Sequence, residues 1–150
     1  QLCFVFKREL LWIPFFGWAL GLLRMIHINR SKGAAASHSI TSQGKKYLAQ
    51  GLWIIIFPEG TRTPVGSSPQ YHKGGARLAS ATNAWVIPIA HNAGHFWPKN
   101  SFLKYPGKII VSIGPAINTA DKSAGQVHQA TEEWIEAEMR VIDAPAYKPK

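Results

Sequence analysis

Four consecutive residues, Glu59, Gly60, Thr61 and Arg62, could bind a phosphate and a hydroxyl group. They follow the apolar run Leu52–Phe57 after a single proline. A guanidinium is a planar donor that matches phosphate oxygens, and glycine lets the backbone turn tightly against a ligand. The carboxylate would either hold the arginine or accept a hydrogen bond from a substrate hydroxyl. The ordinary alternative is a turn that carries a surface ion pair.

The charge distribution favours an anionic partner. The chain of 150 residues carries a formal net charge of +9. Between Leu10 and Ala120 there are 11 Lys and Arg residues and one acid, Glu59. Such a region attracts anions, so nucleic acid, an anionic membrane and a phosphorylated substrate all fit. We expect no nucleic-acid binding, because the basic residues are scattered and no nucleic-acid-binding motif is present.

Apolar runs alternate with helical segments, which indicates an α/β domain. The run 52–57 does not alternate with polar residues, a pattern typical of a strand buried on both faces of a parallel sheet. We therefore predict a single α/β domain with a mostly parallel sheet flanked by helices. Ligands of such sheets bind at the carboxyl ends of the strands, where Asn29-Arg30 and Glu59 both fall. The predicted strands are 2–6, 25–29, 52–57, 85–90 and 108–113, and the predicted helices are 32–50, 73–82 and 123–142.

An uncharged stretch of 14 residues, Leu10–Leu23, separates the first two predicted strands. It is shorter than the about 20 residues that a spanning helix needs. Pro14 and Gly17 disfavour a straight helix. The stretch is therefore either a core segment or an interfacial element with Trp12 and Trp18 at the depth of lipid headgroups, and both interpretations stay open.

The phosphate-binding candidate also resembles a known motif. The run Phe57-Pro58-Glu59-Gly60-Thr61-Arg62 is similar to the FPEGTR motif of glycerolipid acyltransferases, above all the 1-acyl-sn-glycerol-3-phosphate acyltransferases. Further segments resemble that family in the same order, namely 7–10, 13–17, 26–30, 73–74 and 86–90. The resemblance implies a glycerolphosphate-acyltransferase-like domain over residues 1–143 that lacks its N-terminal part. A disordered tail would follow at 144–150.

The resemblance also assigns roles to single residues. The substrate-binding set that it implies is Glu59, Gly60, Thr61, Arg62, Arg30, Lys7 and Lys73. The FPEGTR residues would bind the glycerol phosphate of the acceptor, and Arg30 would share the phosphate charge. Lys7 and Lys73 would add to this pocket unless they are solvated surface charges. Pro88, in a segment similar to the family's fourth motif, is either structural or lines the acyl site.

The family's catalytic element is a His-x4-Asp motif, whose histidine acts as a general base on the acceptor hydroxyl. None of the six histidines has an aspartate five positions later, and His128 has only Glu133 there. We expect the motif to precede Gln1, so that this chain contains no catalytic residue and is inactive by itself. His91 and His95 are spaced like a metal pair but have no third ligand nearby, so we expect no metal and no cofactor.

The implied function is acyl transfer from acyl-CoA or acyl carrier protein to the free hydroxyl of a lysophospholipid. The acceptor would be above all 1-acyl-glycerol-3-phosphate, which gives phosphatidic acid in phospholipid biosynthesis. The implied partners include an anionic membrane surface, and the implied location is the cytoplasmic face of a membrane, in bacteria the inner membrane. The single cysteine, Cys3, agrees with this location and is expected in a buried strand. The alternative is a non-catalytic fragment that binds phospholipid or a membrane surface.

Overall fold

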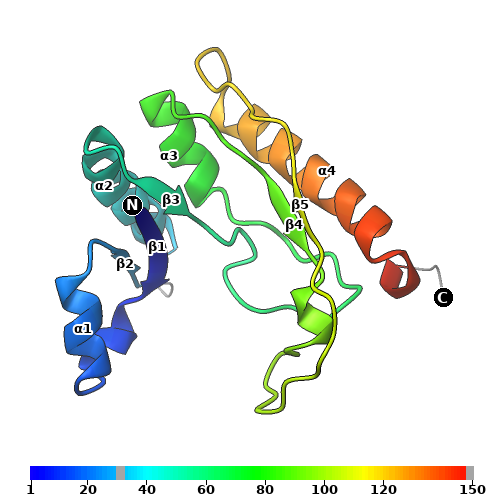
Figure 1. Cartoon of the computed structure of the whole chain (residues 1–150). Helices are drawn as coiled ribbons and strands as arrows, with labels where there is room; N and C mark the ends of the chain where they lie inside the picture. Colours follow the sequence, from blue (N-terminus) through cyan, green and yellow to red (C-terminus); the bar gives the residue numbers. More distant parts are fainter. Residues whose placement is uncertain (30–32, 148–150) are drawn as a thin grey trace.

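The α/β class predicted from the sequence is confirmed. The computed structural model describes residues 1–29 and 33–147, and Figure 1 shows helices arranged around two small sheets. The elements in chain order are β1 (Leu2–Lys7), η1 (Arg8–Trp12), α1 (Phe16–Leu22), β2 (Ile26–Ile28), α2 (Ala34–Ala49), β3 (Trp53–Ile55), α3 (Gly74–Thr82), β4 (Ile89–His91), η3 (Ala93–His95), β5 (Val111–Ile113), α4 (Ala124–Ile142) and η4 (Ala144–Tyr147).

The first sheet is parallel and has the strand order β2-β1-β3. Phe4 of β1 pairs with Ile55 of β3, and Val5 pairs with Ile26 of β2. Cys3 is fully buried in β1, as predicted, and belongs to the largest apolar cluster. That cluster joins the sheet to α2 and α3 and consists of Cys3, Ile26, Ile28, Ile40, Leu52 and Leu78. Burial of these side chains stabilises the sheet and fixes where its strands end.

β3 is an edge strand of this sheet, so the prediction that it is buried on both faces was wrong. Ile54 and Ile56 pack against the core cluster, whereas Trp53 and Phe57 point outward and are exposed. Ile55, on the same face as Trp53 and Phe57, is partly buried, so this face of the strand is only partly covered. An apolar run shows that both faces of a strand carry apolar side chains, but it does not show which face packs against another element.

β4 and β5 form a second sheet of two antiparallel strands, separate from the parallel sheet. The predicted strand 85–90 is broken because Pro88 has no N–H to donate, and only its carbonyl bonds, to the N–H of Gly114 (2.9 Å). Val86 forms an isolated bridge with Ile117 before this break. α4 packs along the pair in Figure 1, and Ile135 of α4 contributes to the core there.

α4 begins and ends close to its prediction. Ser123 caps it in a reciprocal capping box with Gln126. Within the predicted tail, Ala144–Tyr147 form a short 3-10 helix. The N–H of Ala146 donates to the carbonyl of Asp143 (2.9 Å), and the ring of Tyr147 lies 5.7 Å from the guanidinium of Arg140. The rest of the predicted tail, 148–150, lies outside the described residues.

The uncharged stretch 10–23 is neither a straight helix nor a core segment. It contains the end of η1 and the short helix α1, and Phe15 between them has a positive φ of 61°. Gly17 packs directly on the carbonyls of Leu10 and Leu11, where a larger side chain does not fit. Trp12 is 82% exposed and Leu22 is 89% exposed. No helix within the described ranges has the length and apolar character needed to cross a bilayer.

Candidate functional site

Most of the predicted site residues lie at or near the end of the parallel sheet where its strands finish, that is, at their carboxyl ends. Lys7 ends β1 and pairs with Ile28 at the end of β2. β3 leads through Phe57 into the FPEGTR segment, residues 57–62, at the same end of the sheet. Parallel strands place their carboxyl ends together, which is the usual ligand position in such sheets. Arg30 lies outside the described residues, so its role in phosphate binding stays a prediction.

The backbone of the FPEGTR segment is a tight turn fixed by its own hydrogen bonds. The N–H of Gly60 donates to the carbonyl of Phe57 (3.0 Å), and the N–H of His72 donates to the carbonyl of Pro58 (2.8 Å). Gly60 has a positive φ of 65°, and a Cβ there would lie 2.8 Å from Cδ2 of His72. Only glycine suits both conditions, so the turn depends on residue 60.

Glu59 is half-buried and is the single acid of this region. It forms no hydrogen bond or salt bridge with any residue in the ranges 1–29 and 33–147. The possibility that it holds Arg62 in place is therefore not observed. The Glu59 carboxylate still influences Tyr71. The pKa of Tyr71 is raised first by burial, then by Glu136, and more weakly by Glu59. An unpaired, half-buried carboxylate at a strand end remains able to accept a substrate hydroxyl.

Arg62 is exposed and makes one notable contact, which the sequence did not predict. Its guanidinium carbon lies 4.6 Å from the centre of the Trp97 ring, and Nζ of Lys104 lies 4.5 Å from the same centre. Neither cation forms a salt bridge with a described carboxylate. A cation over an indole face is attracted to it while its outward N–H groups stay available. The indole thus contacts Arg62 and leaves its outward N–H groups available.

The remaining predicted residues surround this turn loosely. Thr61 is exposed beside Arg62, and Lys7 is exposed at the end of its strand. Lys73 is exposed directly before α3 and follows His72, the residue that packs on Gly60. None of the three forms a hydrogen bond or salt bridge through its side chain among the described residues. Their assignment to the phosphate pocket stays a prediction.

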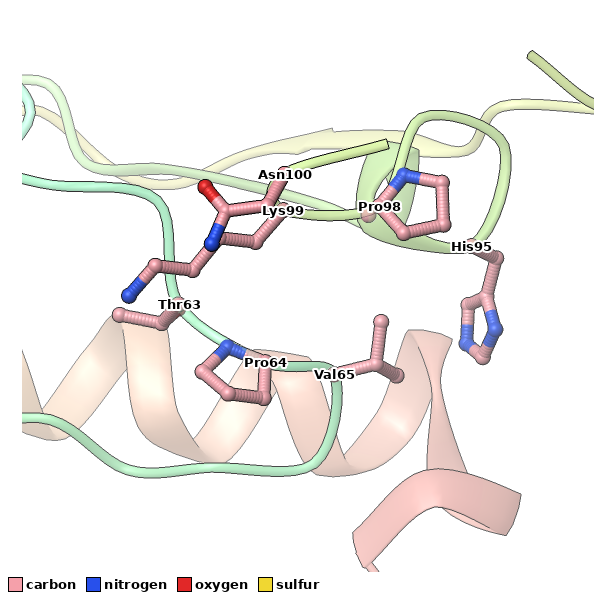
Figure 2. Close-up of a pocket in the computed structure, with 8 residues that line it drawn as sticks. Thr63, Pro64, Val65, His95, Pro98, Lys99 and Asn100 are labelled. Carbon is pink, nitrogen blue, oxygen red and sulfur yellow. The ribbon is translucent and has the colours of Figure 1, made fainter. Parts of the chain in front are cut away.

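A cavity of about 440 Å³ begins immediately after Arg62. Figure 2 shows the segment 63–65 on one side and the loop 95–100 on the other. The lining residues are Thr63, Pro64, Val65, Gly94, His95, Pro98, Lys99 and Asn100. The cavity combines hydrogen-bonding groups, one lysine and apolar side chains, so it suits an amphipathic ligand whose charged end lies toward the FPEGTR segment.

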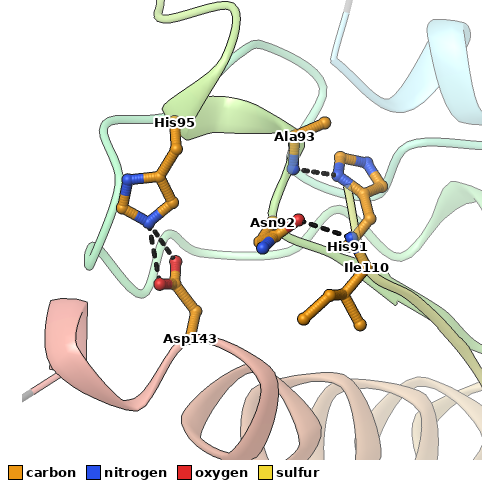
Figure 3. Close-up of polar contacts among 6 residues, drawn as sticks. All are labelled: His91, Asn92, Ala93, His95, Ile110 and Asp143. Atoms are coloured by element: carbon orange, nitrogen blue, oxygen red, sulfur yellow. Dashed lines mark hydrogen bonds and ion pairs between the residues drawn. The ribbon is translucent and has the colours of Figure 1, made fainter. Parts of the chain in front are cut away.

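A histidine–aspartate pair lies at this cavity and was missed by the sequence reasoning. Nε2 of His95 is 2.7 Å from Oδ1 and 2.9 Å from Oδ2 of Asp143, as drawn in Figure 3. The Asp143 side chain is only 8% exposed. The two residues are 48 positions apart, and a search at a fixed spacing of five cannot find such a pair. It ties η3 to the end of α4 and gives the cavity one rigid wall.

His91 and His128 each have a different partner. Nδ1 of His91 accepts from the N–H of Ala93 (3.3 Å), so His91 and His95 do not converge on a common ligand. His128 pairs with Glu132 at 3.4 Å, one helical turn along α4, and not with Glu133. Among the described residues no three His, Cys, Asp or Glu side chains are grouped so that they could hold a metal ion.

The fold and the FPEGTR turn together define an acyltransferase domain, and the comparisons with known proteins agree. The sequence matches the Acyltransferase family over residues 1–92, so the chain belongs to that family. It is 46% identical over 141 residues to the 1-acyl-sn-glycerol-3-phosphate acyltransferase of Pseudomonas aeruginosa. That alignment covers 92% of this chain and 55% of the relative.

Two further comparisons extend this result. A 1-acyl-sn-glycerol-3-phosphate acyltransferase of Cocos nucifera is 32% identical over 127 residues, which cover 84% of this chain and 41% of the relative. The crystal structure of the 1-acyl-sn-glycerophosphate (LPA) acyltransferase PlsC from Thermotoga maritima superposes with a TM-score of 0.66 at 24% identity. The superposition covers 91% of this chain and 56% of the Thermotoga maritima chain, and it shows that the two share the same fold. The chain thus spans about half the length of these relatives.

Proposed function

We propose that this chain carries the acceptor-binding part of a 1-acylglycerol-3-phosphate O-acyltransferase. The enzyme would transfer an acyl group from acyl-CoA or acyl carrier protein to lysophosphatidic acid and form phosphatidic acid. The observation that carries the proposal is a fixed turn at the carboxyl end of β3 that presents Glu59 and Arg62, neither of which forms a hydrogen bond or salt bridge within the described residues. A guanidinium matches the geometry of phosphate oxygens, and Arg62 presents one beside this turn. The membership in the Acyltransferase family agrees with this chemistry.

The reaction balances with simple acid–base chemistry. The acceptor hydroxyl oxygen attacks the thioester carbonyl, a C–O ester bond forms, and the C–S bond breaks. A general base takes the hydroxyl proton, which then passes to the leaving thiolate. We propose that the base is the histidine of a His-x4-Asp motif, which the 150 residues do not contain. Arg62 would hold the acceptor phosphate, while Glu59 would accept a hydrogen bond from the glycerol part.

The test is acyl transfer by the natural protein that contains this sequence, with lysophosphatidic acid and acyl-CoA as substrates. Arg62→Ala should lower kcat/KM by about 100-fold, because it removes a charge-assisted hydrogen bond to the phosphate. Glu59→Gln should lower it by a similar factor. Arg24→Ala is the matched control. Arg24 is exposed and precedes β2, so it lies at the end of the sheet where the strands begin, opposite the proposed site. Rates like those of the unmodified protein in both site variants would contradict the proposal.

The alternative is a non-catalytic chain that binds phospholipid. It predicts that the 150 residues bind lysophosphatidic acid but turn over no acyl-CoA. Measurable turnover by these residues alone would show that they contain a base, and the His95–Asp143 pair is then the candidate to remove first, as His95→Gln. If the variant loses that turnover, the general base is assigned to His95 and not to the His-x4-Asp motif.

We further propose an anionic membrane surface as partner and the cytoplasmic face of a membrane as location. The lipid acceptor resides in a bilayer, and the acid-poor region 10–120 would be drawn to anionic headgroups. Fractionation of cells expressing the natural protein tests this proposal. Recovery in the membrane fraction, with release by high salt, supports an electrostatic contribution; recovery only in the soluble fraction contradicts it.

A further inference from the structure

Residues 97–108 form a loop between η3 and β5 that extends away from both sheets, at the lower end of the molecule in Figure 1. The loop exposes large apolar side chains at its far end, where Phe102 is 94% and Leu103 is 63% exposed. Trp97 and Tyr105 are also exposed. Soluble proteins rarely present adjacent large apolar side chains on a protruding loop without a partner.

The loop is ordered by its own hydrogen bonds, so these side chains are held outward. The N–H of Tyr105 donates to the carbonyl of Phe96 (2.8 Å), which closes the loop. Nε1 of Trp97 donates to the carbonyl of Ser101 (3.1 Å), and Oγ of Ser101 donates to the carbonyl of Leu103 (3.1 Å). A loop that is ordered before binding loses less conformational entropy when its apolar end enters another phase.

The charges of the loop select an anionic partner. Lys99, Lys104 and Lys108 are all exposed, and the sequence has no acid between Glu59 and Asp121. Nζ of Lys104 lies 6.0 Å from the centre of the Phe102 ring and 4.5 Å from that of Trp97. Lysines that flank exposed aromatic residues are typical of segments that lie at the surface of an anionic bilayer.

The same loop reaches the site described above. Trp97 contacts Arg62 of the FPEGTR segment, and Lys99 lines the cavity beside it. We propose that residues 97–108 are a docking loop for an anionic phospholipid bilayer, with Phe102 and Leu103 inserted at headgroup depth. This inference rests on the proposed function, since a lipid acceptor must pass from a bilayer to Arg62. Docking through this loop would place the acceptor-binding turn next to the membrane surface.

The experiment uses an environment-sensitive NBD fluorophore at position 102 of the natural protein, attached through Phe102→Cys. Cys3 is fully buried and is not expected to react, and any other cysteine of the natural protein is first replaced by serine. Vesicles of phosphatidylglycerol should shift the fluorescence to the blue, and vesicles of phosphatidylcholine should not. The matched control is the same label at Val141→Cys, an exposed position of α4, which should not respond.

Two sets of variants separate the apolar and the charged contributions. Phe102→Ser with Leu103→Ser should weaken binding to phosphatidylglycerol vesicles by about tenfold or more, since two apolar side chains no longer enter the bilayer. Lys104→Gln with Lys108→Gln should weaken it by about fivefold per lysine and should reduce the preference for anionic lipid. In detergent-dispersed substrate the serine variant should keep its acyl-transfer rate, because neither residue contacts the acceptor-binding turn.

Three results would overturn the proposal. The label at position 102 could remain unchanged although the protein binds the vesicles, which would locate the contact elsewhere, for example at α1. It could respond to protein concentration without lipid, which would show that a second copy covers the loop. It could respond to acyl carrier protein and not to vesicles, which would make the loop a docking site for that acidic protein. An inactive but vesicle-bound protein would refute the proposed function and leave the docking loop standing.

Discussion

Residues 57–62 and residues 63–72 are the two halves of one loop between β3 and α3, and the structure holds them by different means. The first half is fixed through its backbone, by the hydrogen bonds at Phe57 and Pro58. Its polar side chains, Glu59 and Arg62, have no hydrogen bond or salt bridge within the described part of the chain. The contact of Arg62 with Trp97 leaves its N–H groups free for a ligand.

The second half is held mainly by side chains of α4 and its end. Oγ of Ser68 donates to Glu136 (2.6 Å), and Oη of Tyr71 donates to the same carboxylate (3.1 Å). Gly66 packs directly on the carbonyl of Ala146 in η4. α4 lies beyond the residues that match the family, yet it supports the loop that carries the family's motif. The proposed binding residues and the residues anchored to α4 thus lie in neighbouring segments, so mutations should separate activity from stability.

Gly60→Ala should have the largest effect on activity. A backbone φ of 65° is strained for any residue with a Cβ, so we expect the turn to shift and to carry Glu59 and Arg62 with it. A displacement of about 1 Å at a binding group costs about 100-fold in rate. We expect kcat/KM for lysophosphatidic acid to fall by about that factor, in a protein that still unfolds cooperatively. Unchanged kinetics would show that the turn does not position the ligand.

Gly66→Ala should act mainly on stability. Gly66 has a φ of 76°. A Cβ at this position would collide with the backbone carbonyl of Ala146. The strained backbone costs about 1–3 kcal/mol in the free energy of unfolding, and separation from η4 adds to it. Gly51→Ala is the matched control, because Gly51 also has a φ of 76° but open space around it. Urea unfolding should show a larger loss for residue 66 than for residue 51; equal losses would mean that the contact with η4 contributes nothing.

Glu136→Gln tests the anchor in α4 itself. The variant keeps an acceptor but loses the charge that strengthens both hydrogen bonds, so the free energy of unfolding should fall by about 1–2 kcal/mol. Glu133→Gln is the control, since Glu133 is exposed and, within residues 1–29 and 33–147, accepts only from Gln129 on its own helix. Thermal unfolding of both variants measures the difference. A control variant that loses as much stability as Glu136→Gln would contradict the anchoring role.

The sequence predicted those features that local patterns determine. The FPEGTR run and its place after a strand follow from short-range residue order. The helix predicted at 123–142 has the same local character, and in the structure Ser123 and Gln126 form its cap. Glu136 could not be connected to Ser68 or Tyr71, because that pairing depends on how α4 packs. The same applies to His95 and Asp143, to the Trp97 contact of Arg62, and to the exposed face of β3. Each is set by which surfaces meet, and residue types alone do not state this.

The pH dependence of stability at Tyr71 gives the smallest and most specific test of the second half. Burial, Glu136 and Glu59 raise the pKa of its phenol in the folded protein. The unfolded phenol therefore loses its proton first, at a pH of about 10. This contribution to stability is fully present below that pH and is lost as the pH rises above it.

Tyr71→Phe lacks this proton, so the two proteins should respond differently to alkali. Below pH 9 the variant should be less stable by about 1 kcal/mol, because Glu136 loses a hydrogen bond, and the gap should not change with pH. Toward pH 11 the difference in the free energy of unfolding should narrow. Only the unmodified protein is destabilised there, because its phenol stays neutral in the folded state and ionises in the unfolded state. Urea unfolding at pH 7, 8 and 11 measures it. A gap that stays constant up to pH 11 would show that the phenol titrates freely in the folded loop, and that α4 does not enclose this half as tightly as the contacts at Glu136 indicate.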